Sequence, residues 1–349
     1  MKSALFLFSL FALSHTAQAS DWSSARLLPV QPAPRAVLGT PDPVYMDIFR
    51  AVDQTKLLTV LKQMTGVMPV TVNGSTYSIT DRYAPASKAK FRAFWMQYMT
   101  SLGIPVQEMA YTTAHSIGET QGHNLEAVLP GKSKDSIVII VHYDSIGPGG
   151  NETGNPGVDD DMTGMATLME TARILSLHKD QLQNTVRFVA ADYEEQESPG
   201  LEGARQYAKY IKQKAAQEGF KILTAIDNEQ SGWNCISDGV CSKNDKFDVY
   251  SCSGGFHGFK YSSLGDALAE TATQFSTLQV VRGCMGENSD HYAMWEIGVP
   301  AVVFSEHSAF DNPHFDQNGG DTYDKIDQDY FFKIAQIGVV FAARMAVIQ

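Results

Sequence analysis

The pattern of apolar residues becomes regular at about residue 86. Residues 86–103 place apolar side chains at helical spacing and end on a glycine, which predicts a helix, and residues 105–113 follow as a strand. Two β-like runs come next, and the second contains the continuously apolar segment Ile137–Val141. Such a run is typical of a strand that is buried on both faces of a sheet.

Helical and strand patterns alternate after this segment. Residues 162–177 and 201–213 predict helices, and residues 185–192 and 222–229 predict strands. The alternation predicts an α/β protein with a mostly parallel sheet. In open sheets of this class, functional sites form outside the carboxyl ends of the strands.

Acids and a histidine follow three successive predicted strands. His142 and Asp144 end the first strand, and Glu194 and Glu195 follow the second. Asp227 ends the third. A single residue of this kind is usually a packed histidine or a helix cap, but the repetition at strand ends has no such common explanation. We therefore expect these side chains to form one site.

Three adjacent aspartates, Asp159–Asp161, stand just before the helix predicted from Met162. Because their carboxylates repel one another, a bound cation would explain why they are grouped. The alternative is that Asp161 simply caps that helix. The later segments add Asp290, His291 and His314 as further candidates.

The composition is that of a soluble globular protein. Of its 349 residues, 44% are hydrophobic and 19% are charged, which predicts one large domain or one with a small appendage. The formal net charge of -12 argues against nucleic acids and anionic membrane surfaces as partners, because basic side chains are not in excess. Part of this acidity is available for metal binding.

Residues 1–19 have the features of a secretory signal peptide. Lys2 precedes the apolar run Ala4–Leu13, and Ala17 and Ala19 form an Ala-x-Ala cleavage site. A membrane anchor is the alternative, but the run is much shorter than the roughly 20 residues that span a bilayer. We therefore expect the protein to be exported, either secreted or periplasmic.

Residues 20–85 are expected to form an N-terminal arm with a small helical extension. Proline and polar residues dominate residues 20 to about 50, which predicts an extended conformation there. Residues 86–349 are then the main domain, and they contain all the candidate residues.

Export permits disulfide bonds, and the mature chain has four cysteines. Three pairings are open. We expect Cys235 to pair with Cys241, because both lie in one polar loop, and Cys252 to pair with Cys284. A structural zinc site made of all four is the alternative, but the sequence has no C-x-x-C pair.

Carboxylates and imidazoles without thiolates suit zinc, or a similar divalent ion, in a catalytic role. Two ions about 3.5–4 Å apart need a bridging carboxylate, one carboxylate and one histidine on each ion, and open positions for water. The candidate residues supply this set.

The motifs resemble those of the co-catalytic di-zinc aminopeptidases, typified by secreted bacterial leucyl aminopeptidases and related to glutamate carboxypeptidase and glutaminyl cyclase. The resemblance covers roughly residues 85–347 and rests on HYD, GVDDDMTG, EEQESPGLEG, AID, SDH and NPHFDQNGGDT, in this order. It implies a three-layer αβα sandwich with a mixed central sheet, and a zinc peptidase domain over residues 86–349.

The resemblance also implies the metal ligands. In the family pattern G-x-x-D-x-x-[ST]-G the bridging residue is Asp160, while Asp159 and Asp161 shape the turn. The ligands of one zinc would be His142 and Asp227, and those of the other would be Glu195 and His314. His307 is the alternative to His314, which has the family's Asn-Pro before it and Asp-Thr after it.

Two catalytic roles follow from the same resemblance. Asp144 would hold the imidazole of His142 in the tautomer that binds metal. Glu194 would be the general base, which takes a proton from the attacking water and passes it to the leaving amine.

The expected function is that of an exported metallo-aminopeptidase, a monomer with two zinc ions that acts on peptides or proteins with free amino termini. A single-zinc glutaminyl cyclase on the same fold is one alternative, and a non-catalytic binding ectodomain is another. A serine hydrolase is disfavoured because the sequence has no G-x-S-x-G motif, and it has no H-E-x-x-H helix either.

Glu287, Asp290 and His291 are the candidate substrate-binding residues. Glu287 stands beside Gly286, where well-known secreted members of the family carry a tyrosine of the substrate site. If Glu287 is partly desolvated, its carboxylate should favour Lys or Arg at the amino terminus of the substrate. The alternative is that Glu287 is a solvated loop residue.

Overall fold

A computed structural model describes the chain from Asp42 onward with several gaps, together with a short strand before it. The predicted signal peptide and most of the predicted arm lie outside the described residues. The described ranges are 26–27, 42–113, 120–147, 155–195, 200–252, 262–284, 288–314 and 320–348.

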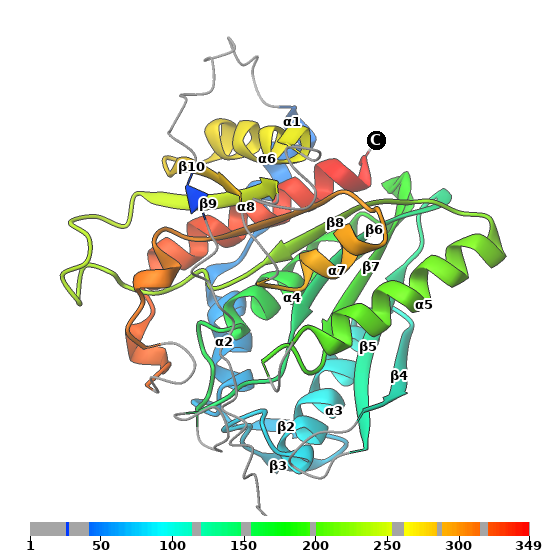
Figure 1. Cartoon of the computed structure of the whole chain (residues 1–349), viewed down its shortest axis with the longest axis horizontal. Coiled ribbons are helices and arrows are strands. Elements are labelled where there is room, and N and C mark those ends of the chain that lie inside the picture. The colour runs from blue at the N-terminus through cyan, green and yellow to red at the C-terminus, as the bar shows by residue number, and fades with distance from the viewer. Residues whose placement is uncertain are drawn as a thin grey trace, which may run out of the picture.

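A mixed sheet forms the centre of the described fold, with the strand order β1-β10-β9-β11-β8-β6-β7-β5-β4 (Figure 1). β6 lies between β7 and β8 and runs parallel to both, whereas β4 and β5 are antiparallel at one edge. The strands are β1 Arg26–Leu27, β4 Val106–Thr112, β5 Gln121–Leu129, β6 Ser133–His142, β7 Asn184–Ala191, β8 Ile222–Asn228, β9 Lys246–Cys252, β10 Gln279–Cys284 and β11 Ala301–Glu306. A separate hairpin pairs β2 Val70–Val72 with β3 Ser75–Tyr77.

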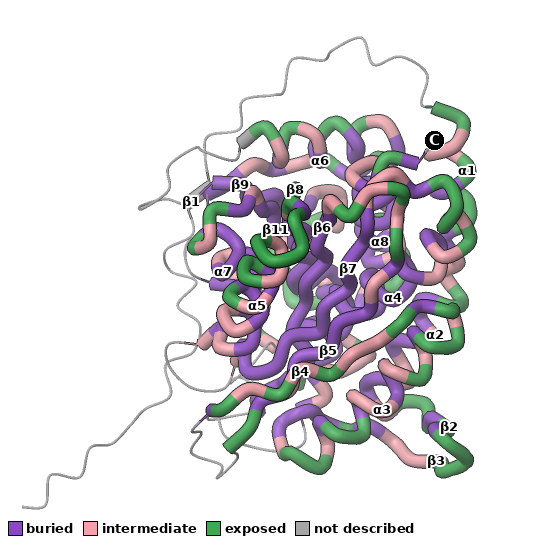
Figure 2. The backbone as a smooth tube through the Cα atoms, turned by 90° about the vertical axis from the view of Figure 1, so that its right-hand side faces the viewer, coloured by how far each residue is buried: buried purple, intermediate pink, exposed green. Residues whose placement is uncertain are grey.

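Helices cover both faces of this sheet, and Figure 2 shows the buried strands between them. Successive residues of β6 point to opposite faces, so Ile139 packs in the core with α4 and α8, whereas Ile140 packs in the core with α5 and α7. The predicted αβα sandwich is therefore confirmed. No described helix is long and apolar enough to cross a bilayer. The helices are α1 Pro43–Ala51, α2 Gln54–Met64, α3 Pro85–Ser101, α4 Met162–Leu177, α5 Glu202–Glu218, α6 Ser262–Phe275, α7 His291–Glu296 and α8 Gln328–Ala346.

The extended arm expected over residues 20 to about 50 is wrong in its last part, because α1 begins at Pro43. Proline favours the first position of a helix, and the carboxylate of Asp42 caps the same turn at 3.0 Å from the N–H of Val44. Ile48 of α1 is fully buried in the core that also contains α4 and α8. The prolines therefore start a packed helix instead of preventing one.

Two disulfide bonds join Cys235 to Cys241 and Cys252 to Cys284. The expected pairing is thus confirmed. The first bond closes a short loop after β8, and the second ties the end of β9 to the end of β10.

The carboxyl ends of β7, β6 and β8 meet at one edge of the sheet, because these three strands are adjacent and parallel. His142 at the end of β6 is in register with Ala191 at the end of β7. Ile139 of β6 is in register with Ile226, two residues before the end of β8. Side chains that follow the three strands are thus brought together.

Candidate metal centre

His142, the last residue of β6, lies at the centre of the site. Its side chain is 1% exposed, and its Nε2 lies 3.0 Å from Oδ1 of Asp160 and 3.6 Å from Oε1 of Glu229. The ligand atoms of these three residues all lie within 4.8 Å of one another. Because zinc binds nitrogen and oxygen at about 2.0–2.2 Å, ligands of one ion are about 3–4 Å apart, so this spacing suits a single cation.

The three adjacent aspartates have three different sets of partners. Asp159 accepts the N–H of Gly232 through Oδ1 at 2.8 Å. Asp161 caps α4 by accepting a backbone N–H of its first turn at 2.9 Å, so the capping interpretation is correct for that residue. Asp160 is the member of the triplet that pairs with His142. Its two neighbours are thus engaged in holding the turn.

Close backbone contacts explain the glycines on either side of this turn. A Cβ on Gly164, in the first turn of α4, would collide with the carbonyl oxygen of Asn228 at the end of β8. Gly157 has φ +50°, and a Cβ there would collide with the carbonyl oxygen of Asp160. Asp321 completes the turn by accepting the N–H of Asp160 at 2.9 Å. The candidate bridging residue is therefore fixed against the end of β8.

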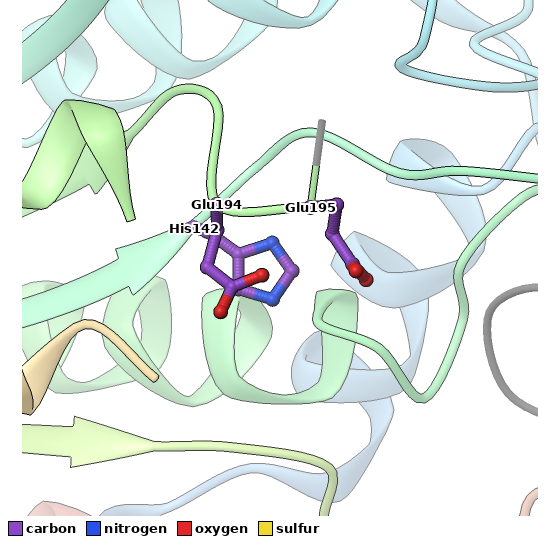
Figure 3. Close-up of side chains that lie close together, drawn as sticks. All are labelled: His142, Glu194 and Glu195. Atoms are coloured by element: carbon purple, nitrogen blue, oxygen red, sulfur yellow. The ribbon is translucent and has the colours of Figure 1, made fainter. Parts of the chain in front are cut away.

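The paired glutamates after β7 are held by Asp144. The carboxylate of Asp144 accepts the N–H of Glu194 at 3.0 Å and that of Glu195 at 3.1 Å. Its Oδ1 also lies 3.6 Å from Nδ1 of His142. Figure 3 shows Glu194 and Glu195 together with His142, and their ligand atoms lie within 4.8 Å of one another. One buried carboxylate therefore connects the imidazole with both glutamates.

Glu229 is the site residue that the sequence analysis missed. It directly follows β8 and is 2% exposed, and its carboxylate completes the group with His142 and Asp160. Its Oε2 accepts a hydrogen bond from Ser289 at 2.6 Å. Glu229 could have been considered from the sequence, because side chains in an extended segment alternate between faces. If the extended conformation continues for one residue past β8, residues 227 and 229 point to the same face.

Asp227, the ligand expected from the sequence, has other partners in the structure. Its Oδ2 accepts hydrogen bonds from Ser289 Oγ at 2.7 Å and from the N–H of His291 at 3.0 Å. Its ligand atom groups with those of Asp161 and Glu229, and not with that of the imidazole at the end of β6. Asp227 therefore contacts Ser289 and His291, whereas Glu229 is the carboxylate beside His142.

Burial and repulsion between carboxylates dominate the electrostatics of the site. Burial, together with the charge of Asp160, raises the pKa of Glu229 to about 8 although His142 lowers it. Burial also raises the pKa of Glu194 well above its usual range, against the charge of His142. For Asp144 burial acts in the same direction, but the hydrogen bond and charge of His142 bring its pKa below the usual value. A bound cation would keep such a cluster ionised.

The two histidines considered for the last ligand have carboxylate partners. Nε2 of His314 lies 3.1 Å from Asp238, within the loop closed by Cys235 and Cys241. Nδ1 of His307 lies 2.7 Å from Asp248. Neither histidine belongs to a group of close ligand atoms among the residues that the structure describes.

Two of the three candidate substrate residues are buried near Asp227. Asp290 and His291 are fully buried, and Nδ1 of His291 lies 3.3 Å from Asp227. After burial, the charge of Asp290 contributes to the raised pKa of Glu194. Glu287 lies outside the described residues.

The buried carboxylates fit a metal ion. Within the described ranges, Oδ2 of Asp161, Oδ1 of Asp227 and both oxygens of Asp290 are buried without a hydrogen-bond partner. A buried charge without a partner is costly, so such groups either bind a proton or pair with a cation. The donors are carboxylates and an imidazole without thiolates, which is a set that zinc accepts.

Comparisons with known proteins relate this chain to a family of peptidases. Peptidase family M28 matches residues 124–342. A probable leucine aminopeptidase 1 from Trichophyton verrucosum is 24% identical over 289 residues, which cover 77% of this chain and 71% of that protein. A zinc aminopeptidase from Bacillus subtilis has a TM-score of 0.65 at 12% identity, and the match covers 84% of this chain and 95% of the aminopeptidase. A glutaminyl cyclase from Macrostomum lignano has a TM-score of 0.68 at 16% identity, and the match covers 90% of this chain and 96% of the cyclase.

Proposed function

This chain belongs to peptidase family M28, whose pattern matches more than half of it, and we propose that it is an exported zinc aminopeptidase. Its relatives by sequence are named leucine aminopeptidases, so the family resemblance and the metallo-aminopeptidase class predicted from the sequence are confirmed. The observation that carries the proposal is the convergence of His142, Asp160 and Glu229 at the carboxyl end of the sheet.

These three residues would hold the first zinc ion. Glu229 replaces Asp227 in the ligand set expected from the sequence, because its carboxylate is the one beside His142. Asp227 would support this ligand through Ser289, whose hydroxyl lies 2.7 Å from Asp227 and 2.6 Å from Glu229. Hydrogen bonds of this kind orient ligands and tune metal affinity.

Asp160, Glu195 and His314 would hold the second ion. Oδ2 of Asp160 accepts a hydrogen bond from Gln230 at 2.9 Å, and a carboxylate oxygen has a second lone pair for a metal. His314 would leave Asp238 or share it, and both side chains are partly exposed, at 20% and 25%. Because a partly exposed ion pair contributes about 1 kcal/mol or less, this exchange costs little.

Glu194 would be the general base. Zinc supplies the Lewis acidity that activates water and polarises the scissile carbonyl. Glu194 takes a proton from the attacking water and delivers it to the nitrogen of the leaving amine. Burial raises the pKa of Glu194, and a bound cation would lower it again, so that the carboxylate is ionised when it accepts the proton. Asp144 keeps Glu194 in place through the backbone N–H of that residue.

The acid-rich site also suits the substrate. A free amino terminus is positively charged, and carboxylates at the site attract it. Asp290 and His291 would contribute to substrate binding indirectly, because they are buried and His291 contacts Asp227. Glu287 would favour a basic residue at the amino terminus of the substrate, as expected from the sequence. Two disulfide bonds support export.

Glutaminyl cyclase is the second candidate, since one solved cyclase shares this fold. Assaying the purified protein on a panel of aminoacyl amides and on peptides with amino-terminal glutamine separates the two activities. The proposal predicts release of the amine from the amides, loss of that activity with a chelator, and recovery on addition of zinc. Cyclisation of glutamine without hydrolysis of the amides would contradict it.

A further inference from the structure

A lysine is completely buried beneath the turn that carries Glu194. Lys88, in the first turns of α3, has its Nζ 3.1 Å from Oδ1 of Asp192, and both side chains are 0% exposed. The same Nζ lies 3.4 Å from the centroid of the Tyr193 ring, which places the ammonium over the aromatic face. Burying an ammonium costs free energy, and contacts of Lys88 with Asp192 and with the ring of Tyr193 offset part of this cost.

Asp192 is the hydrogen-bond centre of that turn. Its carboxylate accepts the N–H of His123 at 3.0 Å and that of Tyr193 at 3.1 Å. Its own N–H donates to the side chain of Asn124 at 3.0 Å, and its carbonyl accepts the hydroxyl of Tyr111 at 3.2 Å. The carboxylate that Lys88 neutralises therefore fixes the chain where it leaves β7.

Tyr193 adopts a conformation that an aromatic residue rarely has. Its φ is 58°, in the left-handed region, and such backbone strain persists where the surroundings impose it. The carbonyl of Tyr193 accepts the N–H of Glu202, and that of Glu194 accepts the N–H of Leu201. The reversal at Tyr193 directs the chain so that the next N–H groups, of Glu194 and Glu195, reach Asp144.

We propose that Lys88 is a positioning residue for the general base, acting through Asp192 and the ring of Tyr193 on the backbone that presents Glu194. The role rests on the proposed function of Glu194. Lys88 fixes the entry to the turn, as Asp144 fixes its exit. Lys88 and the whole of α3 precede residues 124–342, so this contribution comes from outside the part of the chain that the family pattern matches.

The test removes both charges together. Lys88→Met alone would leave Asp192 buried and unpaired, which can unfold the protein, whereas Lys88→Met with Asp192→Asn keeps the shapes and removes the charges. We expect kcat to fall roughly 10-fold or more, because a displaced catalytic group loses its alignment, while KM stays near its native value and the zinc held by His142, Asp160 and Glu229 is retained. Lys88→Arg keeps the charge and should recover part of kcat.

A matched pair of substitutions controls for stability. Arg187 and Glu126 form another buried ion pair, 2.9 Å apart with 6% and 1% exposure, between β7 and β5. Arg187→Met with Glu126→Gln should lower the Tm without a selective loss of kcat. If both double variants lose kcat in proportion to their loss of Tm, or if the Lys88 and Asp192 double variant keeps native kcat, the positioning role is wrong.

Two further variants keep the test decisive. If the charge-free variant does not fold, Tyr193→Gly accepts the positive φ but lacks the ring, and it should lower kcat where Tyr193→Phe does not. Native kcat in Tyr193→Gly would overturn the proposal. Glu194→Gln is assayed beside them: if it keeps full activity, the general-base assignment fails, whereas its inactivity together with native kcat in the Lys88 variants contradicts the positioning role alone.

Discussion

Nε2 of His142 lies 3.0 Å from Oδ1 of Asp160, although the two residues are 18 positions apart in the chain. The first ends β6 and the second precedes α4, so the contact depends on the turn that Gly157, Gly164 and Asp321 hold against the end of β8. Glu229 joins the pair from β8.

Glu229 and Asp227 can be separated by metal content. Glu229→Gln removes a charged ligand atom beside His142, so we expect the bound zinc to fall by about one ion per chain. Asp227→Asn should keep that ion with affinity reduced about 10-fold to 100-fold, as is usual for partners of ligands. Elemental analysis after dialysis measures the zinc content of both variants. Loss of zinc in Asp227→Asn with retention in Glu229→Gln would mean that Asp227, as expected from the sequence, is the ligand.

Glu194→Gln tests the general base. The amide keeps the size of the side chain but cannot accept a proton from water, so kcat should fall by roughly 10² or more. Zinc content should not change, because Glu194 is not a proposed ligand. Steady-state kinetics with metal analysis of the same sample check this, and simultaneous loss of metal would mean that Glu194 binds the ion.

Asp160→Asn should empty both metal positions, because its carboxylate is the proposed bridge. Asp159→Asn is the matched control: Asp159 hydrogen bonds to Gly232 and Asn312 on the far side of the turn, so at least one ion should remain. Zinc binding by competition with a chromophoric chelator compares the two variants. Loss of zinc in Asp159→Asn alone would move the bridge to that residue.

The two disulfide bonds should differ in their contribution to stability. Cys252–Cys284 closes a separation of 32 residues and Cys235–Cys241 one of 6. In the chain-entropy description the longer loop stabilises more, by roughly 1.5 kcal/mol. Urea unfolding of the two double alanine variants measures the difference, and a larger loss from the short loop would show that it has another role, such as holding Asp238 beside His314.

The sequence was sufficient to predict the layers of the fold and several of the side chains that meet at the carboxyl ends of the strands. Continuous apolar runs predicted buried strands, and the rule that sites form at the carboxyl ends of parallel strands then selected His142, Asp144, Glu194 and Glu195. These residues converge because β6 lies between β7 and β8, a neighbour relationship that the alternation of elements favours.

Other features depend on contacts that the local sequence does not specify. Asp227 lies near the end of β8 and Glu229 directly after it, and the partners of their carboxylates, Ser289 and His142, are far away in the chain. Lys88 is a charged residue in a helix, which ordinarily indicates a solvated position, and its burial follows from Asp192. The helix at Pro43 was missed because proline is common both in extended segments and at the first position of helices.

Titration of the metal-free protein with zinc measures how hydrolysis depends on bound metal. Hydrolysis of leucyl amide is measured after each addition, with bound zinc determined on the same samples. The proposed two-zinc site predicts activity that rises with zinc and reaches its maximum at two ions per chain in the native protein, and that does not recover at the same zinc concentration in Glu229→Gln. Full activity of Glu229→Gln at native zinc content, or zinc binding without any hydrolysis, would contradict it.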